Sequence, residues 1–385
     1  MKAVSPRVGV VCNSLKGGGA EGNAALLVRS WPEDAGSALL IAVSDHGDLP
    51  VSDLDGIEVR TLGIGRWPRP RATLRVIRRL RREIFVHGLT HLVTNSYGLN
   101  QTILLARRLR LVPRQVGIIV VEHLSLAGRL ERRLRGQWRR RGVALVLRWL
   151  YRAEAHLVAV SLGVASDNER LLRLPAGTFT VIPNGIDRSR LATLRRTTPD
   201  EAFARRFERL PRPIVVGVGR LEAQKNFPLL IDAFLQAFPD EGSLVILGEG
   251  GLRGAIESGL AHRSAADRVR LPGRVSNPYW YLDRADLFVL SSDYEGYPIV
   301  LLEALACGTP VVATDCPWGP AEMLGRVPSA RVVPVRDLRA MTRAIREALP
   351  QAPADRIERI AWDSRDMAAS YAELIGSEVP RRHPA

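Results

Sequence analysis

Short apolar runs alternate with amphipathic stretches along the first half of the chain. The runs are rich in Val, Ile and Leu, as is typical of strands that are buried on both faces of a parallel sheet. Between them, apolar residues recur at helical spacing, for example at residues 71–84 and 100–110. This alternation predicts a parallel sheet with helices on both faces. The predicted strands lie at residues 7–12, 38–44, 90–95, 116–123 and 156–161.

The same alternation starts again after a polar, charged stretch that ends at Pro213. It predicts a second α/β domain and a helical pattern at residues 356–375, so we expect two doubly wound domains that face a cleft. The predicted domains are residues 1–185, residues 186–360 and a C-terminal helix within 361–385 that packs back on the first domain. The second set of predicted strands lies at residues 214–219, 243–248, 268–273, 287–291, 310–315 and 331–335.

Length and composition agree with this organisation. At ~150 residues per domain, 385 residues favour two domains. No apolar run approaches the ~20 residues that a bilayer crossing needs, and the N-terminus lacks the apolar core of a signal peptide. The three cysteines are too few for a disulfide scaffold. The sequence therefore predicts a cytoplasmic protein without a spanning segment.

Charge is distributed unevenly along the chain. Residues 1–185 contain 28 basic and 14 acidic residues, whereas residues 186–385 contain 27 and 26. Two arginine-dense stretches, 66–82 and 104–152, account for much of this excess, and the second contains the basic, tryptophan-bearing segment 129–151. Such a segment is typical of a helix that lies on an anionic membrane. It carries no nucleic-acid-binding signature, so we expect a membrane surface and no nucleic acid as its partner.

The segment SSDYEGYPIVLLEALACGTP, residues 291–310, carries the strongest local signal. A strand is expected to end near Ser292 and a helix to begin near Pro298. Glu295 would then lie in the turn, and Glu303, eight residues later, would lie in the helix. The carboxyl ends of strands are where open α/β sheets bind ligands, and free N–H groups at a helix start attract phosphate.

This segment resembles the Glu-x7-Glu signature of retaining, nucleotide-sugar-dependent glycosyltransferases of family 4. Other segments resemble the family in the same order along nearly the whole chain. They are VIPNGID at 181–187, VGRLEAQKNFPLLIDAF at 218–234, LGEGGLR at 247–253 and CPWGPAEML at 316–324. The resemblance implies the GT-B fold, with two Rossmann-like domains, the acceptor mostly in the first and the nucleotide-sugar donor in the second.

The resemblance also implies roles for particular residues. Arg220 and Lys225 would neutralise the departing diphosphate, Glu303 would hold the ribose hydroxyls, and Glu295 would hold the hydroxyls of the donor sugar. The family has no clear enzymatic nucleophile, and we name no general base. The implied catalytic residues are His123, Arg220, Lys225 and Glu295. The implied donor-binding residues are Gly18, Gly19, Arg220, Lys225, Glu295, Gly296, Tyr297, Pro298, Ile299 and Glu303.

Two of these assignments depend on the first domain. Gly18 and Gly19 belong to a glycine cluster at the first strand–helix turn, where a ligand can approach the backbone closely. His123 ends the predicted strand 116–123, and alternation along a strand should direct Glu122 to the other face. A similar histidine lies near the reacting sugar in many relatives, which implies a role in binding donor or acceptor.

The expected substrates follow from the same resemblance. The donor is a nucleotide sugar, with UDP preferred, and the acceptor is a lipid-linked or other glycan in polysaccharide biosynthesis. No cofactor and no metal are expected, because basic side chains and helix N-termini can neutralise the diphosphate. The basic first half predicts a peripheral location at the inner face of the cell membrane.

Two alternatives use the same architecture. A sugar-nucleotide 2-epimerase of GT-B fold would need acid and base groups on both sides of C2, and the sequence does not supply that set. A degenerate transferase that acts as a basic binding scaffold would not need intact Arg220, Lys225, Glu295 and Glu303. Product that forms only with an acceptor would distinguish the transferase from the epimerase, and slow donor hydrolysis without an acceptor would distinguish it from the scaffold.

Overall fold

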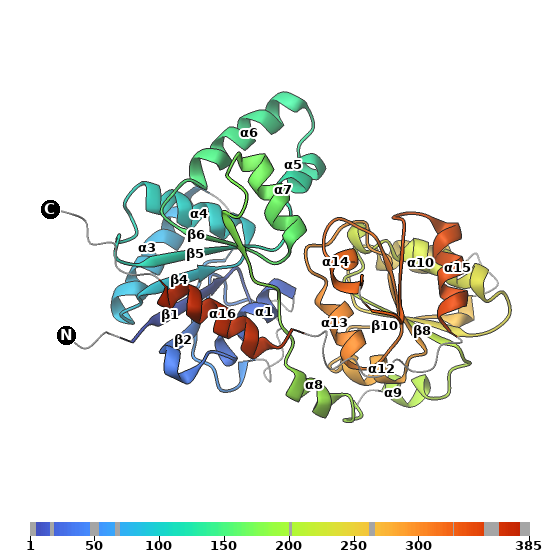
Figure 1. Cartoon of the computed structure of the whole chain (residues 1–385). Helices are drawn as coiled ribbons and strands as arrows, with labels where there is room; N and C mark the ends of the chain where they lie inside the picture. The colour runs from blue at the N-terminus through green and yellow to red at the C-terminus, as the bar shows by residue number, and fades with distance from the viewer. Residues whose placement is uncertain are drawn as a thin grey trace. The chain divides into compact units, whose positions relative to one another are not determined.

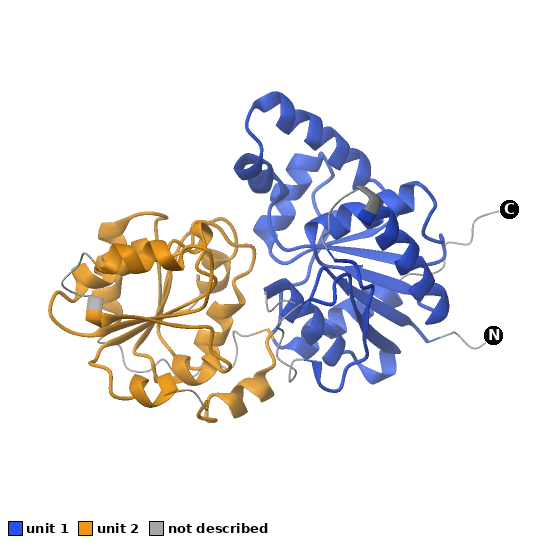
Figure 2. Cartoon of the chain, turned by 180° about the vertical axis from the view of Figure 1, so that it is seen from behind, with its two compact units in different colours: residues 1–185, 363–385 blue, residues 186–362 orange. Residues whose placement is uncertain are grey.

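The computed structural model divides the chain into two compact units (Figures 1 and 2). Unit 1 comprises residues 1–185 and 363–385, and unit 2 comprises residues 186–362. The residues that the structure describes are 5–15, 19–46, 54–65, 70–199, 202–261, 266–325, 327–349 and 362–377.

Unit 1 contains a seven-stranded sheet in the order β3-β2-β1-β4-β5-β6-β7, and all the neighbouring strands are parallel. The central strands are buried on both faces, which explains their continuous apolar sequences. The strands are β1 Arg7–Cys12, β2 Ser37–Ala42, β3 Val59–Thr61, β4 His91–Thr94, β5 Gly117–Glu122, β6 His156–Ala159 and β7 Phe179–Val181.

Helices connect these parallel strands. The C-terminal helix α16 also belongs to unit 1. Helix α16 packs against α1 (Figure 1). The Ser30 hydroxyl donates to the Ser364 hydroxyl at 2.8 Å. The helices of unit 1 are α1 Gly19–Arg29, α3 Pro70–Val86, α4 Tyr97–Arg108, α5 Leu126–Arg133, α6 Gln137–Leu150, α7 Leu162–Leu172 and α16 Ser364–Gly376, and a short 3-10 helix lies at Glu33–Ala35.

Unit 2 contains a six-stranded sheet in the order β10-β9-β8-β11-β12-β13, again with parallel neighbours. One face of this sheet packs against a cluster that includes Trp280 and Tyr281, and both of these side chains are fully buried. The strands are β8 Ile214–Val218, β9 Ser243–Leu247, β10 Val269–Gly273, β11 Leu287–Leu290, β12 Val311–Thr314 and β13 Ala330–Val333.

Side chains cap the start of some helices in unit 2. The Asp337 carboxylate accepts from the backbone N–H of Ala340 at 2.9 Å at the start of α15, and Asn277 caps α12. The helices are α8 Arg188–Leu194, α9 Ala202–Phe207, α10 Phe227–Ala237, α11 Arg253–Ala261, α12 Pro278–Arg284, α13 Ile299–Ala306, α14 Pro320–Leu324 and α15 Leu338–Ala348. Short 3-10 helices lie at Ala223–Lys225 and Ala266–Arg268.

The predicted fold class, two doubly wound α/β domains, is confirmed. The two outer strands β3 and β7 of unit 1 were missed, because three residues are too few to show a clear pattern. The basic segment 129–151 does not form one helix. It is divided between α5 and α6, and Gly136 between them has a φ of 89°, a conformation that glycine adopts without strain.

Candidate active site

The carboxyl ends of β8 and β11 meet where the strand order of the unit 2 sheet reverses. Strands β9 and β10 lie on one side of β8, and β11, β12 and β13 extend from the other side. Open α/β sheets bind ligands outside the carboxyl ends of their strands at such a reversal. Arg220 and Lys225 follow β8, and Glu295 follows β11. Both segments therefore lie at the edge where a ligand is expected.

Lys225 and Glu295 form an ion pair at this edge. Lys225 Nζ lies 2.6 Å from Glu295 Oε1, and the two side chains are only 16% and 9% exposed. The Ser292 hydroxyl donates to the same carboxylate oxygen at 2.7 Å, whereas Oε2 receives only a 3.3 Å bond from Gln224 Nε2. Oε1 is thus committed to the protein, and Oε2 retains the capacity to accept a hydrogen bond from a ligand.

The loop that carries Lys225 is fastened to the loop after β11 through its backbone and side chains. The Ser291 hydroxyl donates to the Lys225 carbonyl at 2.7 Å, and the Asp293 N–H donates to the Gln224 carbonyl at 2.8 Å. Asn226 Nδ2 donates to Asp293 Oδ1 at 3.0 Å. These bonds hold Lys225 in place before any ligand binds. The sequence prediction missed these supporting residues because they lie about 70 positions from their partners.

Arg220 differs from Lys225 in its surroundings. Its side chain is exposed, and it forms no ion pair with any residue that the structure describes. It lies directly after Gly219, whose N–H donates to the Leu247 carbonyl at 3.0 Å. The two cations thus occupy one loop: Lys225 is paired and mostly buried, whereas Arg220 is exposed to solvent.

The glycine-rich turn after β9 packs against this loop through its backbone. A Cβ on Gly248 would lie 1.9 Å from the Gly219 carbonyl oxygen, and a Cβ on Gly250 would lie within 2.7 Å of the Leu221 backbone. Gly248 also has a φ of 147°. Glycine at these two positions is therefore required by the neighbouring protein backbone, independently of any ligand.

We expect Gly248→Ala to lower the free energy of unfolding by about 3 kcal/mol, because neither backbone can move away from the new methyl group. Gly254→Ala is the matched control, since a Cβ there meets nothing within 4 Å and the residue lies in α11. It should stabilise by ~0.5–1 kcal/mol. Urea unfolding of both variants measures the difference, and equal stability would contradict this account of the turn.

Residues 296–299 connect the Glu295 turn to α13. Pro298 precedes the first helical residue, Ile299, with a φ of −72°. A Cβ on Gly319 would lie 3.0 Å from both the Gly296 carbonyl oxygen and Pro298 Cδ, so the Cys-Pro-Trp-Gly-Pro segment packs closely over this connection. Burial, together with the charge of Glu322, raises the pKa of Tyr297 to about 12, so its hydroxyl stays protonated.

Glu303 lies in the second turn of α13. Burial raises the pKa of its carboxyl to about 7, and the Tyr279 hydroxyl, which donates to Oε1 at 3.1 Å, opposes that rise. Among the described residues no cation pairs with this carboxylate. Tyr279, in α12, was not predicted as a site residue, because its sequence context, Asn-Pro-Tyr-Trp-Tyr, indicates only a helix start and a core.

His123 lies directly after β5 in unit 1. Its Nε2 is buried and has no hydrogen-bond partner among the described residues, and burial lowers the pKa of the imidazole to about 4. The ring is therefore neutral at physiological pH and can exchange a hydrogen bond with a ligand. Glu122 has a different role, since its carboxylate accepts hydrogen bonds from the Asn100 amide at 2.8 Å and from the Tyr151 hydroxyl.

The other predicted positions of unit 1 are only partly described. Gly18 lies outside the described residues, and Gly19 begins α1, where a Cβ would meet nothing within 4 Å. The structure also places Arg129 of α5 over the ring of Tyr97, at 4.2 Å from the centroid. Burial lowers the pKa of this guanidinium, which forms no ion pair with a described residue.

The described residues form neither a metal-binding cluster nor a membrane-spanning helix. Nowhere in the described ranges do three or more His, Cys, Asp or Glu side chains gather so that they could hold a metal ion. Of the helices in the described part of the chain, none is long and apolar enough to cross a membrane.

Family models match both units. Residues 17–190 match the model for glycosyltransferase family 4, and residues 212–351 match the model for glycosyl transferases group 1. Among solved structures, HepE of Anabaena in complex with UDP and glucose superimposes with a TM-score of 0.74 and 18% identity, covering 96% of this chain and 99% of that one. Sucrose-phosphate synthase of Thermosynechococcus elongatus gives a TM-score of 0.75 at 18% identity, covering 96% and 98%. These likenesses show the GT-B fold.

Curated relatives match over shorter segments. An N-acetylgalactosaminyltransferase of Campylobacter jejuni, which acts on a diphospho-undecaprenol-linked acceptor, is 39% identical over 111 residues, 29% of this chain and 30% of its own. The lipopolysaccharide core mannosyltransferase LpsB of Rhizobium meliloti is 36% identical over 222 residues, 51% of this chain and 61% of its own. The chain thus spans between about a third and three fifths of these relatives.

Both matching models describe glycosyltransferases, and the fold of the two units is the GT-B fold of such enzymes. This chain therefore resembles those enzymes over both units, with a family 4 match in its first half followed by a group 1 match in its second half.

Proposed function

We propose that this enzyme transfers a sugar from a nucleotide-sugar donor, preferably a UDP-sugar, to a lipid-linked or other glycan acceptor with retention of the anomeric configuration. The observation that carries the proposal is the Lys225–Glu295 ion pair at the strand-order reversal of unit 2, followed eight residues later by Glu303. An ammonium and two carboxylates at this edge match the needs of a diphosphate and of two sets of sugar hydroxyls.

Each residue has a defined task in this proposal. Lys225 Nζ has three protons, and the Glu295 contact uses one, so the others can bind phosphate oxygens. Arg220 adds a second, solvent-facing cation that can grip two phosphate oxygens. Together they stabilise the negative charge that develops as the bond between the anomeric carbon and the phosphate oxygen breaks.

The sugar is held by the carboxylates. Glu295 Oε2 accepts from a hydroxyl of the donor sugar, and Glu303 accepts from the ribose hydroxyls. The acceptor hydroxyl attacks the anomeric carbon from the side that the diphosphate leaves, and its proton passes to a phosphate oxygen. This course needs no protein nucleophile and no metal, and it retains the anomeric configuration.

The acceptor is assigned to unit 1 and to a membrane surface. The names of the Campylobacter and Rhizobium relatives place those proteins in lipid-linked glycan and lipopolysaccharide synthesis, which supports an acceptor of this kind here. Helix α6 exposes Trp138, Leu145 and Trp149 between arginines. We therefore place the enzyme at the inner face of the cell membrane, bound peripherally by this helix.

Glu303→Ala tests the donor site. Hydrogen bonds to a charged group contribute ~1.5–3 kcal/mol, so we expect affinity for UDP to fall about 10- to 100-fold. The measurement is calorimetric titration with UDP, and with GDP in parallel. Glu347→Ala is the control, because this exposed glutamate of α15 forms no ion pair with a described residue and should leave affinity unchanged.

Equal UDP affinity in a folded Glu303→Ala variant would contradict the assignment. The reaction itself is tested by incubating UDP-sugars with and without lipid-linked glycan acceptors. Product that forms only with an acceptor and retains the anomeric configuration by NMR supports the transferase. A 2-epimerase would convert the donor without any acceptor, and a scaffold would form no product.

A further inference from the structure

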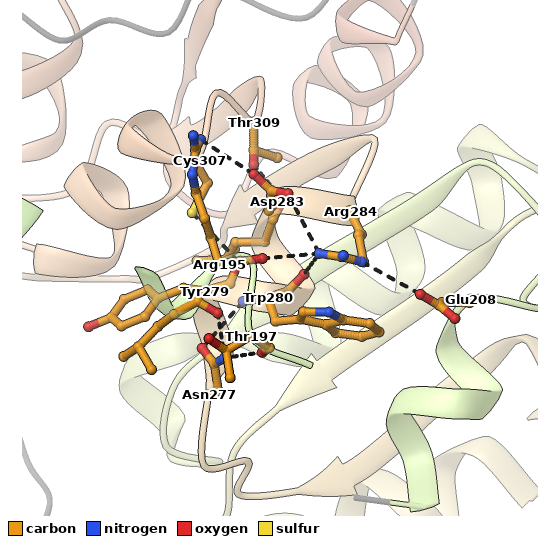
Figure 3. Close-up of polar contacts among 12 residues, drawn as sticks. Arg195, Thr197, Glu208, Asn277, Tyr279, Trp280, Asp283, Arg284, Cys307 and Thr309 are labelled. Atoms are coloured by element: carbon orange, nitrogen blue, oxygen red, sulfur yellow. Dashed lines mark hydrogen bonds and ion pairs between the residues drawn. The ribbon is translucent and has the colours of Figure 1, made fainter. Parts of the chain in front are cut away.

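Helix α12 is held at its start by a side chain that acts in two directions. Asn277 accepts from the Trp280 N–H at 3.4 Å and so caps the helix. The same amide donates to the carbonyls of Leu194 and Thr197, at 2.7 and 2.8 Å, and so binds α12 to the end of α8 (Figure 3). The start of α12 is thus fixed against a neighbouring helix.

The other end of α12 is also held by neighbouring segments. Arg284 stacks over the Trp280 ring, 4.3 Å from its centroid, and donates to the Arg195 carbonyl at 3.1 Å (Figure 3). The Thr309 hydroxyl donates to the Leu282 carbonyl at 2.6 Å. A seven-residue helix is not stable by its own propensity, so these contacts and its buried core residues hold its position.

Tyr279 projects from this fixed helix toward α13. Figure 3 shows its ring extending away from the bonded cluster, with the hydroxyl at the far end. That hydroxyl donates to Glu303 Oε1 at 3.1 Å, and the Tyr279 carbonyl accepts a 3.6 Å contact from the Cys307 thiol at the end of α13. Two contacts thus join α12 to the helix that carries Glu303.

We propose that Tyr279 is a positioning residue of the donor site, which holds Glu303 through Oε1 and leaves Oε2 to accept the ribose hydroxyls of the nucleotide. This inference rests on the proposed function and adds to it a residue that the sequence did not indicate. Because α12 is fixed at both ends, the tyrosine hydroxyl is a stationary donor, and the carboxylate keeps one orientation before the nucleotide binds.

The hydrogen bond from Tyr279 also affects the ionisation of the Glu303 carboxyl. Burial raises the pKa of Glu303 to about 7, and among the described residues the Tyr279 hydroxyl is the side-chain group that donates a hydrogen bond to this carboxylate. A hydrogen bond donated to the ionised form favours that form. Loss of the hydroxyl therefore raises the pKa further, and at neutral pH more of the carboxyl is protonated and accepts hydrogen bonds poorly.

Tyr279→Phe separates these effects from folding. At about pH 7 we expect affinity for UDP to fall about tenfold, with kcat at saturating donor little changed. The affinity of the wild type should rise as pH increases through about 7, and that midpoint should move upward in Tyr279→Phe. The two proteins should therefore differ most at low pH, and the difference that remains near pH 9, where both carboxyls are ionised, is the effect of the lost orientation.

Tyr281→Phe is the matched control. It removes a hydroxyl from the same helix, and that hydroxyl is not bonded to Glu303. It should leave the pH dependence of UDP affinity unchanged, whatever its effect on stability. A purely structural role of Tyr279 would lower the melting temperature and leave the midpoint where it is.

The outcomes also separate this inference from the proposed function. Wild-type protein that binds UDP or GDP, with the same affinity and the same midpoint in Tyr279→Phe, would overturn the positioning role and leave the donor site intact. Wild-type protein that binds neither nucleotide would overturn the proposed function itself. The inference is supported if the midpoint of the pH dependence rises in Tyr279→Phe but not in Tyr281→Phe, and if Glu303→Gln binds UDP weakly at every pH.

Discussion

Replacing Lys225 by methionine should lower turnover about 100- to 1,000-fold at saturating donor, the effect of removing one group that stabilises charge in a transition state. Methionine keeps most of the side-chain volume and removes the ammonium. Arg220→Lys is the comparison and should lose less, since Arg220 is exposed and its charge is kept. Steady-state rates with a UDP-sugar and an acceptor measure both.

Removing Lys225 also breaks its ion pair with Glu295, which can lower stability, so a second substitution is needed to separate stability from turnover. Without Lys225, the buried Glu295 carboxylate retains only Ser292 and Gln224, and an unpaired buried charge is destabilising. The double variant Lys225→Met/Glu295→Gln removes that charge, so it should recover melting temperature but not turnover. Near-normal turnover in folded Lys225→Met would contradict the diphosphate role.

The pattern of buried strands predicted the fold because parallel sheets with helices on both faces need continuous apolar runs. The predicted strand 7–12 coincides with β1, and the predicted strand 287–291 ends one residue beyond β11. Helix ends were less well predicted. The expected helix 356–375 corresponds to α16, which begins at Ser364, and residues 350–361 lie outside the described part of the chain.

Local sequence can identify candidate site residues but cannot show which of them contact one another. Lys225 and Glu295 were both candidates, yet their ion pair joins residues 70 positions apart and depends on β8 and β11 being neighbours. Tyr279, in contrast, could not be identified even as a candidate from the sequence. Nothing in Asn-Pro-Tyr-Trp-Tyr distinguishes the tyrosine that reaches Glu303 from the tyrosine that fills the core.

The exposed surface of α6 is the basis for a second prediction, which concerns binding to anionic membranes. Trp138, Leu145, Val146 and Trp149 are 82%, 61%, 56% and 48% exposed, whereas Ala144, Leu147 and Leu150 on the same helix are buried. The Arg141 guanidinium lies over the Trp138 ring, 5.4 Å from its centroid. Exposed aromatic residues between arginines suit the boundary between lipid headgroups and acyl chains.

The structure also shows which arginines can be changed safely. Arg140 donates to the backbone carbonyls of Leu134 and Glu131, at 2.9 and 3.1 Å, and so supports the connection between α5 and α6. Arg139 and Arg141 are exposed and make no ion pair with a described residue. Reversing Arg139 and Arg141 therefore tests membrane attraction and leaves the backbone contacts of Arg140 in place, although it removes the exposed contact of Arg141 with the Trp138 ring.

We expect Arg139→Glu/Arg141→Glu to weaken binding to phosphatidylglycerol vesicles roughly 30- to 1,000-fold, since each basic residue at an anionic surface contributes ~1 kcal/mol and reversal adds repulsion. Arg205→Glu/Arg206→Glu in α9 changes the net charge equally at exposed positions and should bind as the wild type does.

Trp138→Ser should weaken binding at high salt, where charge is screened and the apolar contact remains. Vesicle flotation with excess DNA measures all four proteins. Equal binding to neutral and anionic vesicles, or equal loss in the α9 control, would contradict a membrane surface on α6 and favour a soluble acceptor.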